Sequence, residues 1–297
     1  MSVLPGMTGL PGLIGFAAAG DLTYVFNPES LFANGEVGMT LLPGTEYTTL
    51  FQERTGASAT TVAGVGDPVG TVRCNITGRY AVAAGDDGRP TLIDDGGYLA
   101  LQFSSATSLA LITASNIDWS VTDEQSTFFK VRKTSDATQG LPVNFNSGTS
   151  LYSFSLRAPA GTDLTNARWF CRGSGSSQTV QITGLTSPIT LLGYGINKLS
   201  TDYWDFKINE ESVNPTSTLG GEAFESGPLA FGGRATGGEV FNGLIYGIIV
   251  RGKLPANNDE RDAVEAYLAE SSAFFSVSGG WDDAAAWDDS KTWETLS

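Results

Sequence analysis

Residues 241–270, FNGLIYGIIVRGKLPANNDERDAVEAYLAE, constrain the fold more than any other stretch of the sequence. Residues 244–250 form an apolar run with almost no polar interruption. Such a run is typical of a strand that is covered on both faces, so something must pack on each side of it. Pro255 and the two asparagines after it end the strand.

The residues after this strand predict one short amphipathic helix. Asn257 and Glu260 have the spacing of a helix N-cap and its capping-box partner. Val264, Tyr267 and Leu268 stand at i, i+3 and i+4, the spacing of one buried helix face. We expect the helix to pack back on the body of the protein and to close its globular part, because the composition changes sharply after residue 271.

From Tyr47 onward, short runs of alternating apolar and polar residues are separated by turn residues. This alternation predicts antiparallel strands with one buried and one exposed face. The clearest runs are residues 99–103, 152–156, 180–182 and 204–208, while residues 128–131 and 189–192 are denser and expected to be more buried. The predicted fold class is all-β, a two-sheet antiparallel jelly-roll-like sandwich with one short C-terminal helix and extended N- and C-terminal arms.

The sequence divides into three predicted parts. Residues 1–45 are expected to be an anchoring arm and connector, which could add an edge strand, residues 46–275 the sandwich, and residues 276–297 a tail. Hydrophobic residues make up 41% of the chain and charged residues 16%, so the sandwich has enough apolar side chains for a sizeable core.

The formal net charge is −15, from 32 acidic and 17 basic residues, and no basic run interrupts it. Binding to a phosphate backbone needs a basic surface, so nucleic acid is not an expected partner. No segment approaches the roughly 20 apolar residues of a membrane span. The stretch around Ile14 has no Lys or Arg before it, which disfavours a signal peptide.

The chain contains no histidine, which removes Ser-His and Cys-His nucleophile pairs and His-ligated zinc. Cys74 and Cys171 fit no metal-binding spacing. They could form one disulfide or remain as two buried free thiols. No cofactor is expected.

Adjacent carboxylates occur in turn-like sequence, where solvated loop acids are the ordinary explanation. They are Asp86-Asp87, Asp94-Asp95, Asp123-Glu124 and Glu210-Glu211. Glycoside hydrolysis needs two carboxylates across one cleft, and nothing in these pairs indicates such a cleft. The chain is therefore predicted not to be an enzyme and to have no catalytic residues. Calcium at the first two pairs stays an open alternative without a loop signature, and no metal site is predicted.

Sugar binding uses exposed aromatic rings beside amide and carboxylate groups. Trp119, Trp169 and Trp204 are candidates by residue type, but Trp204 fits the inward face of its strand. Trp169 stands beside Arg168 and Arg172, just before a Gly/Ser-rich loop. Trp169 and Arg172 are therefore the predicted ligand-binding residues.

The N-terminal arm carries glycines at every third position, Gly6, Gly9, Gly12 and Gly15, followed by Phe16. Four glycines are too few for an independent collagen-like triple helix. An extended Gly/Pro arm and a trimeric collar both remain open. Since an apolar arm would not stay free in water, we expect these residues to dock on partner proteins or on sister chains, with a trimer as the favoured homo-oligomer.

The tail carries Trp281, Trp287 and Trp293 at a spacing of six residues, each followed by an acidic residue. On an extended strand an even spacing places all three indoles on one face. This pattern indicates a strip that docks on a neighbouring subunit, or else a tail that packs on its own sandwich or is partly disordered.

Several patches together resemble a known family. The sequences Leu50-Phe51-Gln52-Glu53, Asp67-Pro68-Val69-Gly70, Arg89-Pro90-Thr91-Leu92 and Tyr98-Leu99-Ala100-Leu101-Gln102-Phe103, and the closing segment with Phe241-Asn242-Gly243 and Ile248-Ile249-Val250, are similar to concanavalin A-like (laminin-G-like) lectin/glucanase domains of bacteriophage virion and tail structural proteins. The resemblance covers residues 47–270. Residues 74–80 depart from the family pattern, and the Glu-x-Asp-x-x-Glu strand of the related glucanases is absent.

The resemblance implies a virion protein, associated with a tail, fibre or head, that displays a lectin-like domain for attachment to host surface glycan. Its partners would be other virion proteins and host surface polysaccharide. A capsid decoration or cement protein without sugar binding is one alternative. An enzyme that degrades polysaccharide is another, which the missing glucanase strand disfavours.

Overall fold

The computed structural model describes residues 26–104, 109–146, 152–161, 164–175, 177–215, 218–221 and 223–271, together with the backbone of residues 17–18 and 21–22. The residues predicted to anchor or assemble the protein lie outside the described side chains. They are Gly6, Gly9, Gly12, Gly15, Phe16, Trp281, Trp287 and Trp293.

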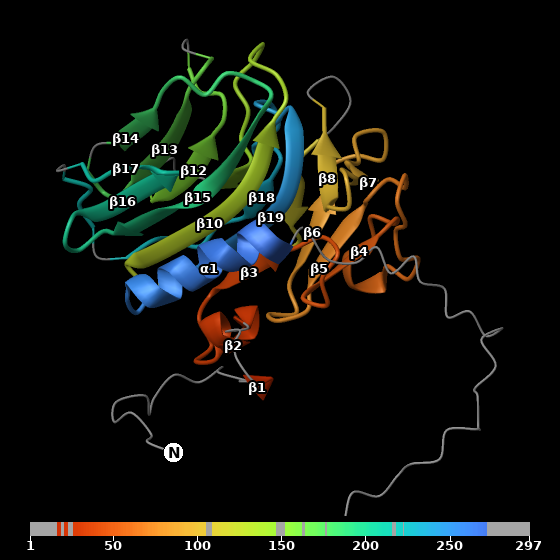
Figure 1. Ribbon diagram of the computed structural model, residues 1–297, viewed down its shortest axis with the longest axis horizontal. Coiled ribbons are helices and arrows are strands. Elements are labelled where there is room, and N and C mark those ends of the chain that lie inside the picture. The colour runs from red at the N-terminus through yellow and green to blue at the C-terminus, as the bar shows by residue number, and fades with distance from the viewer. Residues whose placement is uncertain are drawn as a thin grey trace, which may run out of the picture.

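The described residues form a sandwich of two antiparallel sheets, as the sequence predicts (Figure 1). We call the first the helix-side sheet. Its strand order is β17-β16-β15-β10-β19-β8-β7, and β3 pairs with β19 beside this path. Its strands are β3 Gly38–Leu41, β7 Thr91–Asp94, β8 Leu99–Phe103, β10 Glu124–Lys133, β15 Ile189–Lys198, β16 Tyr203–Ile208, β17 Glu211–Val213 and β19 Gly243–Arg251.

We call the second the far sheet. Its strand order is β14-β13-β12-β11-β18-β9-β6-β5-β4. Its strands are β4 Thr48–Phe51, β5 Thr71–Cys74, β6 Tyr80–Ala83, β9 Leu111–Thr113, β11 Val143–Phe145, β12 Ser153–Arg157, β13 Ala167–Arg172, β14 Ser177–Ile182 and β18 Leu229–Phe231. The other elements are the short pair β1 Ala17–Ala18 and β2 Asp21–Leu22, the 3-10 helices η1 Pro28–Phe32 and η2 Gly56–Ser58, and the helix α1 Asn258–Ser271.

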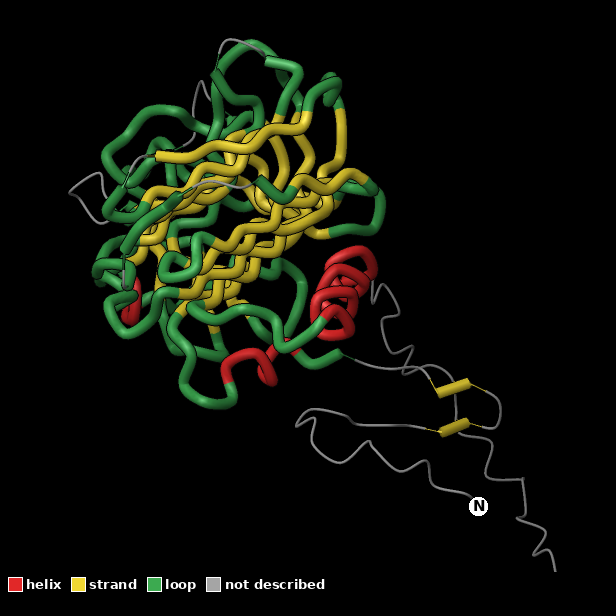
Figure 2. The backbone as a smooth tube through the Cα atoms, turned by 90° about the vertical axis from the view of Figure 1, so that its left-hand side faces the viewer, coloured by secondary structure: helices red, strands yellow, loops and turns green. Residues whose placement is uncertain are grey.

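Strand β19 is buried along its whole length, which confirms the prediction for residues 244–250. On one face its side chains enter the core between the sheets. On the other face Ile249 packs with Val264 and Leu268 of α1 and with Leu31 of η1. Figure 2 shows α1 on the outside of the strands. No helix of the described residues is both long and apolar enough to cross a membrane.

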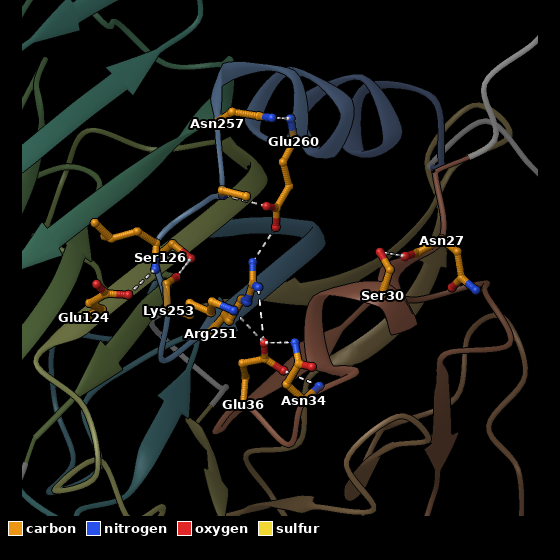
Figure 3. Close-up of polar contacts among 12 residues, drawn as sticks. Asn27, Ser30, Asn34, Glu36, Glu124, Ser126, Arg251, Lys253, Asn257 and Glu260 are labelled. Carbon is orange, nitrogen blue, oxygen red and sulfur yellow. Dashed lines mark hydrogen bonds and ion pairs between the residues drawn. The ribbon is translucent and has the colours of Figure 1, made fainter. Parts of the chain in front are cut away.

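The predicted cap of α1 is confirmed, with one difference in its hydrogen bonds (Figure 3). The Glu260 backbone N–H donates to Asn257 Oδ1 at 2.9 Å, as a helix N-cap requires. The Glu260 carboxylate accepts from the backbone N–H of Ala256 at 2.6 Å rather than from that of Asn257. It also forms an ion pair with Arg251 at the end of β19, so the cap is tied to the sheet.

The sandwich begins earlier in the chain than the predicted boundary at residue 46. Strand β3 pairs with β19, and its Met39 and Leu41 are fully buried in the main core. The prediction placed this segment in a turn-rich connector that could add an edge strand, and β3 is that strand. The boundary at residue 46 therefore falls inside the sandwich.

Both cysteines are free and buried, on strands β5 and β13 of the far sheet, which are not neighbours. This decides between the two alternatives that the sequence left open. Burial raises the pKa of the Cys171 thiol well above its ordinary value, so Cys171 is an unreactive core residue.

Candidate functional site

The structure contradicts the predicted role of Trp169. Its side chain is 0% exposed and lies in the core, and its indole N–H donates to Asn197 Oδ1 at 2.6 Å. Its ring stacks between Phe154 and Phe206, at centroid distances of 6.1 and 6.3 Å. An indole without an exposed face cannot stack on a sugar, so Trp169 is a structural residue. Trp119 and Trp204 are buried as well, and the inward position predicted for Trp204 is confirmed.

Arg172 does not accompany Trp169. The side chains of β13 alternate between the two faces of the far sheet, and Trp169 and Cys171 face the core. Arg168 and Arg172 are therefore on the outer face of the sheet. Arg172 is half-buried there, and its Nε has no hydrogen-bond partner. The structure thus separates the two predicted ligand-binding residues onto opposite faces.

Tyr203 meets the requirement that Trp169 fails. Its side chain is 44% exposed, and among the described residues it is the one aromatic side chain in the exposed class. Tyr203 opens β16, directly after the turn that joins β15 to β16, and pairs with Lys198 across the hairpin. Trp204 and Phe206 face the core, so the alternation of the strand turns Tyr203 outward.

Two hollows meet at Tyr203. The first has a volume of about 260 Å³ and lies between the helix-side sheet and the start of α1, with Ile196, Leu254, Asn258 and Arg261 in its lining. Its wall combines apolar side chains with an amide and a guanidinium. Among its other lining residues is Lys198, which is held by an ion pair with Glu124 at 2.8 Å.

The second hollow has a volume of about 660 Å³ and is lined by Tyr203 together with Asp202, Asn214 and Thr218. Asp202 Oδ1 accepts from the backbone N–H groups of Leu219 and Gly220 at 2.7 and 3.1 Å. This carboxylate therefore holds the chain after Thr218 against the β15–β16 turn. Asp202 itself has φ +54°, a left-handed conformation that Asp tolerates better than most residues.

A hydrogen-bonded network fixes the polar side of the first hollow. Arg261 binds Asp205 at 2.9 Å and donates to Asn258 Oδ1 at 2.8 Å. Its guanidinium lies 5.2 Å from the centre of the Tyr194 ring. The Tyr194 hydroxyl donates to Asp205 at 3.1 Å. These contacts hold Arg261 in one position, so the hollow is largely preformed.

The electrostatic surroundings of Tyr203 keep its hydroxyl protonated. Burial raises the pKa of Tyr203 above its ordinary value, and the charge of Asp205 raises it further, while Arg261 acts in the opposite direction. At neutral pH the hydroxyl can therefore donate and accept hydrogen bonds.

The polar groups around Tyr203 supply hydrogen-bond donors and acceptors. Burial raises the pKa of one described carboxyl group, Glu265, whose ion pair with Lys207 at 3.0 Å opposes the shift, and Glu265 lines neither hollow. Among the described residues, no three Cys, Asp or Glu side chains gather in a group that could hold a metal ion. The arrangement can stack on a flat apolar face and bond to the hydroxyls around it.

No family model matches the chain, and a search of curated proteins finds no match. Among solved structures, the binding domain of botulinum neurotoxin DC in complex with rat synaptotagmin II is 11% identical, with a TM-score of 0.48, over 67% of this chain and 49% of that chain. The receptor-binding domain of the botulinum neurotoxin C/D mosaic is 13% identical, with a TM-score of 0.47, over 66% and 48%.

A third similar structure is the CBM40 of Ruminococcus gnavus IT-sialidase bound to α2,3-sialyllactose, 15% identical with a TM-score of 0.38, over 48% of this chain and 83% of that chain. The chain spans about half the length of the two toxin domains. At these identities and TM-scores the likenesses carry no argument about what this protein binds.

The sequence contained signals for both corrections. Arg168 and Arg172 stand one and three residues from Trp169, and an odd spacing on a strand places residues on opposite faces. Tyr203 stands two and four residues before Asp205 and Lys207, so it lies on the polar side of β16. The sequence predicted the apolar side of this strand correctly. No local pattern in the sequence predicts the hollows beside Tyr203, because α1, Asn214 and Thr218, which help to line them, come from later in the chain.

Proposed function

We propose that this protein is a lectin-like β-sandwich that binds glycan at Tyr203. The observation that carries this proposal is an exposed tyrosine ring that lines two hollows, in a fold whose described tryptophans and phenylalanines are buried or half-buried.

A saccharide fits the chemistry of both hollows. The C–H face of a pyranose ring can stack on an aromatic side chain, while its hydroxyls need nearby donors and acceptors. Asn258 and Arg261 supply them in the first hollow, and Asp202 and Asn214 supply them in the second. Because Tyr203 lines both hollows, they would accommodate neighbouring sugars of a chain.

A glycan array tests the proposal with the full-length protein and the Tyr203→Ala variant. Loss of the stacking contact, about 0.5–1.5 kcal/mol, should weaken binding of every bound glycan by up to about tenfold. Tyr80→Ala is the matched control, because Tyr80 is a half-buried tyrosine on β6 of the far sheet. We expect this control to bind as the unaltered protein does.

Two results would contradict sugar binding at Tyr203. The first is an array on which the unaltered protein binds nothing, which would favour the decoration or cement role. The second is binding that Tyr203→Ala and Tyr80→Ala reduce equally.

We further propose that the sandwich belongs to a bacteriophage virion, where it faces the host and docks on other virion proteins through its N-terminal arm. The resemblance of the family-like patches motivates this proposal, and these patches contact one another in the fold. Gln52 Nε2 donates to Asp67 at 2.8 Å, and Arg89 donates to the Gln52 carbonyl at 2.8 Å. The Val69 N–H donates to the Pro90 carbonyl at 2.7 Å. Patches that are separate in the sequence thus form one region of the fold.

The anchoring role is tested by a chain that lacks residues 1–25. The shortened protein keeps the described core, which begins at Leu31, so we expect it to fold. We also expect it to be missing from purified particles assembled in its presence. Normal incorporation would mean that the arm is not the anchor.

A further inference from the structure

Three arginines gather on the outer face of the far sheet, although the sequence contains no basic run there. They are Arg157 on β12 and Arg168 and Arg172 on β13. Side chains alternate along these strands, and Leu156, Trp169 and Cys171 face the core. The arginines next to them in the sequence therefore face outward. Arg157 and Arg168 are directly opposite each other in the register of the two strands.

This placement of charge is costly in the unliganded protein. Like charges directly opposite each other on neighbouring strands are destabilising. None of the ion pairs among the described residues includes Arg157, Arg168 or Arg172, although the chain has 32 acidic residues against 17 basic ones. Arg168 instead donates to the neutral Gln181 Oε1 at 2.8 Å, and its Nε is buried without a partner.

Arg157 is held in place more firmly than an ordinary surface arginine. Its guanidinium lies 4.7 Å from the centre of the Phe170 ring, and its Nε reaches Ser155 Oγ at 3.5 Å. Burial lowers the pKa of Arg157; the charge of Glu239 opposes this shift, and those of Arg234 and Arg168 add to it. Glu239 is itself paired with Arg234, so it does not neutralise Arg157.

Between the arginines and β11, the outer face of the far sheet carries two buried polar side chains, Asn144 and Ser155, and one half-buried aromatic ring, Phe170. Asn144 on β11 and Ser155 on β12 are aligned with Phe170 on β13 in the strand register. The Asn144 Oδ1 is buried and has no hydrogen-bond partner. An anion between Arg157 and Arg168 would remove their mutual repulsion, and the planar, forked guanidinium matches a carboxylate well.

We propose that the outer face of the far sheet holds a second binding site, in which Arg157 and Arg168 bind the carboxylate of an acidic saccharide beside Phe170. This site is separate from Tyr203, which lies on the helix-side sheet. Its existence does not depend on the function proposed for Tyr203.

Titration calorimetry of the full-length protein with tetragalacturonate tests the proposal. The fully methyl-esterified tetragalacturonate has the same sugar rings without the charge. We expect the charged form to bind at least about tenfold more tightly, as one charge-assisted bidentate contact provides. Arg157→Gln and Arg168→Gln should each weaken binding of the charged form by about tenfold or more.

Arg73→Gln serves as the control. It removes an equal charge from the outer face of β5 in the same sheet, where Arg73 is exposed. We expect this variant to bind tetragalacturonate within about twofold of the unaltered protein, since Arg73 does not reach the proposed contact.

The proposal is wrong if the protein does not bind tetragalacturonate, or if the methyl ester binds equally well. It is also wrong if Arg73→Gln weakens binding as much as Arg157→Gln does, because that would indicate non-specific attraction. Thermal unfolding checks each variant. If Arg157→Gln loses stability with its contact to Phe170, Arg168→Gln carries the same test, because the Arg168 side chain bonds instead to Gln181.

Discussion

Gly195 illustrates how single residues determine the core beneath the candidate site. It lies on β15, opposite the indole of Trp169, and a Cβ built on it would be 2.2 Å from Trp169 Cδ2. Only glycine leaves room for the indole there, and the indole is held in turn by its bond to Asn197. At the scale of the residue, the buried tryptophan and the glycine are a matched pair across the two sheets.

The variant Gly195→Ala should therefore be destabilised. Overpacking of a tight core costs about 1–3 kcal/mol, and the contact here is with a ring that cannot turn away easily. The free energy of unfolding from a denaturant titration measures this loss. Gly64→Ala is the control, because a Cβ there meets only Asp67 Oδ2, at 3.4 Å. Equal stability of the two variants would show that the core is looser than the structure indicates.

At the scale of secondary-structure elements, one cluster of charges joins β19 to the segment before β3 and to the helix α1 (Figure 3). Arg251 is 5% exposed and pairs with Glu260 of α1 and with Glu36 at 3.5 Å. Removing one member of a buried charge cluster leaves the others uncompensated, which typically costs about 3–5 kcal/mol. This cluster holds the helix that forms one side of the first hollow.

The cluster gives the protein a specific response to acid. Burial acts to raise the pKa of Glu36, but hydrogen bonds from its own backbone, from Asn34 and from Lys253 outweigh it and lower the pKa to about 2. Because the folded-state pKa lies below the ordinary value of 4.5, the stabilisation by Glu36 is fully present above pH 4.5. It is lost as the pH falls toward 2.

Unfolding free energies of the protein and of Glu36→Gln, measured from pH 7 to pH 2, test this response. We expect the difference between the two proteins to be constant above pH 4.5 and to shrink steadily below it. A difference that stays unchanged down to pH 2 would show that Glu36 is not held as a carboxylate by these contacts.

The elements also show where the sequence was sufficient and where it was not. The burial of β19 and the cap of α1 depend on periodicity and on residues within one turn, and both were predicted. Strand β3 was assigned to the connector because turn residues surround it in the sequence, although an edge strand was expected there. The arginine cluster depends on the register between β12 and β13, and no pattern within either strand reveals that register.

At the scale of the whole molecule, the N-terminal segment from residue 26 is part of the sandwich and not a linker. It supplies β3 to the helix-side sheet and places Leu31 and Phe32 against α1. A chain lacking residues 1–45 loses Leu31, Met39 and Leu41, each worth about 2–5 kcal/mol when buried. The sum reaches the whole stability of an ordinary domain, about 5–15 kcal/mol.

We therefore predict that the chain lacking residues 1–45 does not fold, whereas the chain lacking residues 1–25 does. Circular dichroism and thermal unfolding of the two shortened proteins measure this difference. If the chain lacking residues 1–45 unfolds cooperatively at the same temperature as the chain lacking residues 1–25, the sandwich begins at residue 46 and this prediction is wrong.

The most direct test of glycan binding at Tyr203 is a backbone-amide chemical-shift map of the full-length protein with its strongest ligand from the array. We predict the largest shift changes at Tyr203, at Asn258 in the first hollow and at Asn214 in the second, and their loss in Tyr203→Ala. Largest changes on another surface, with the amides around Tyr203 unmoved, would contradict the proposed function.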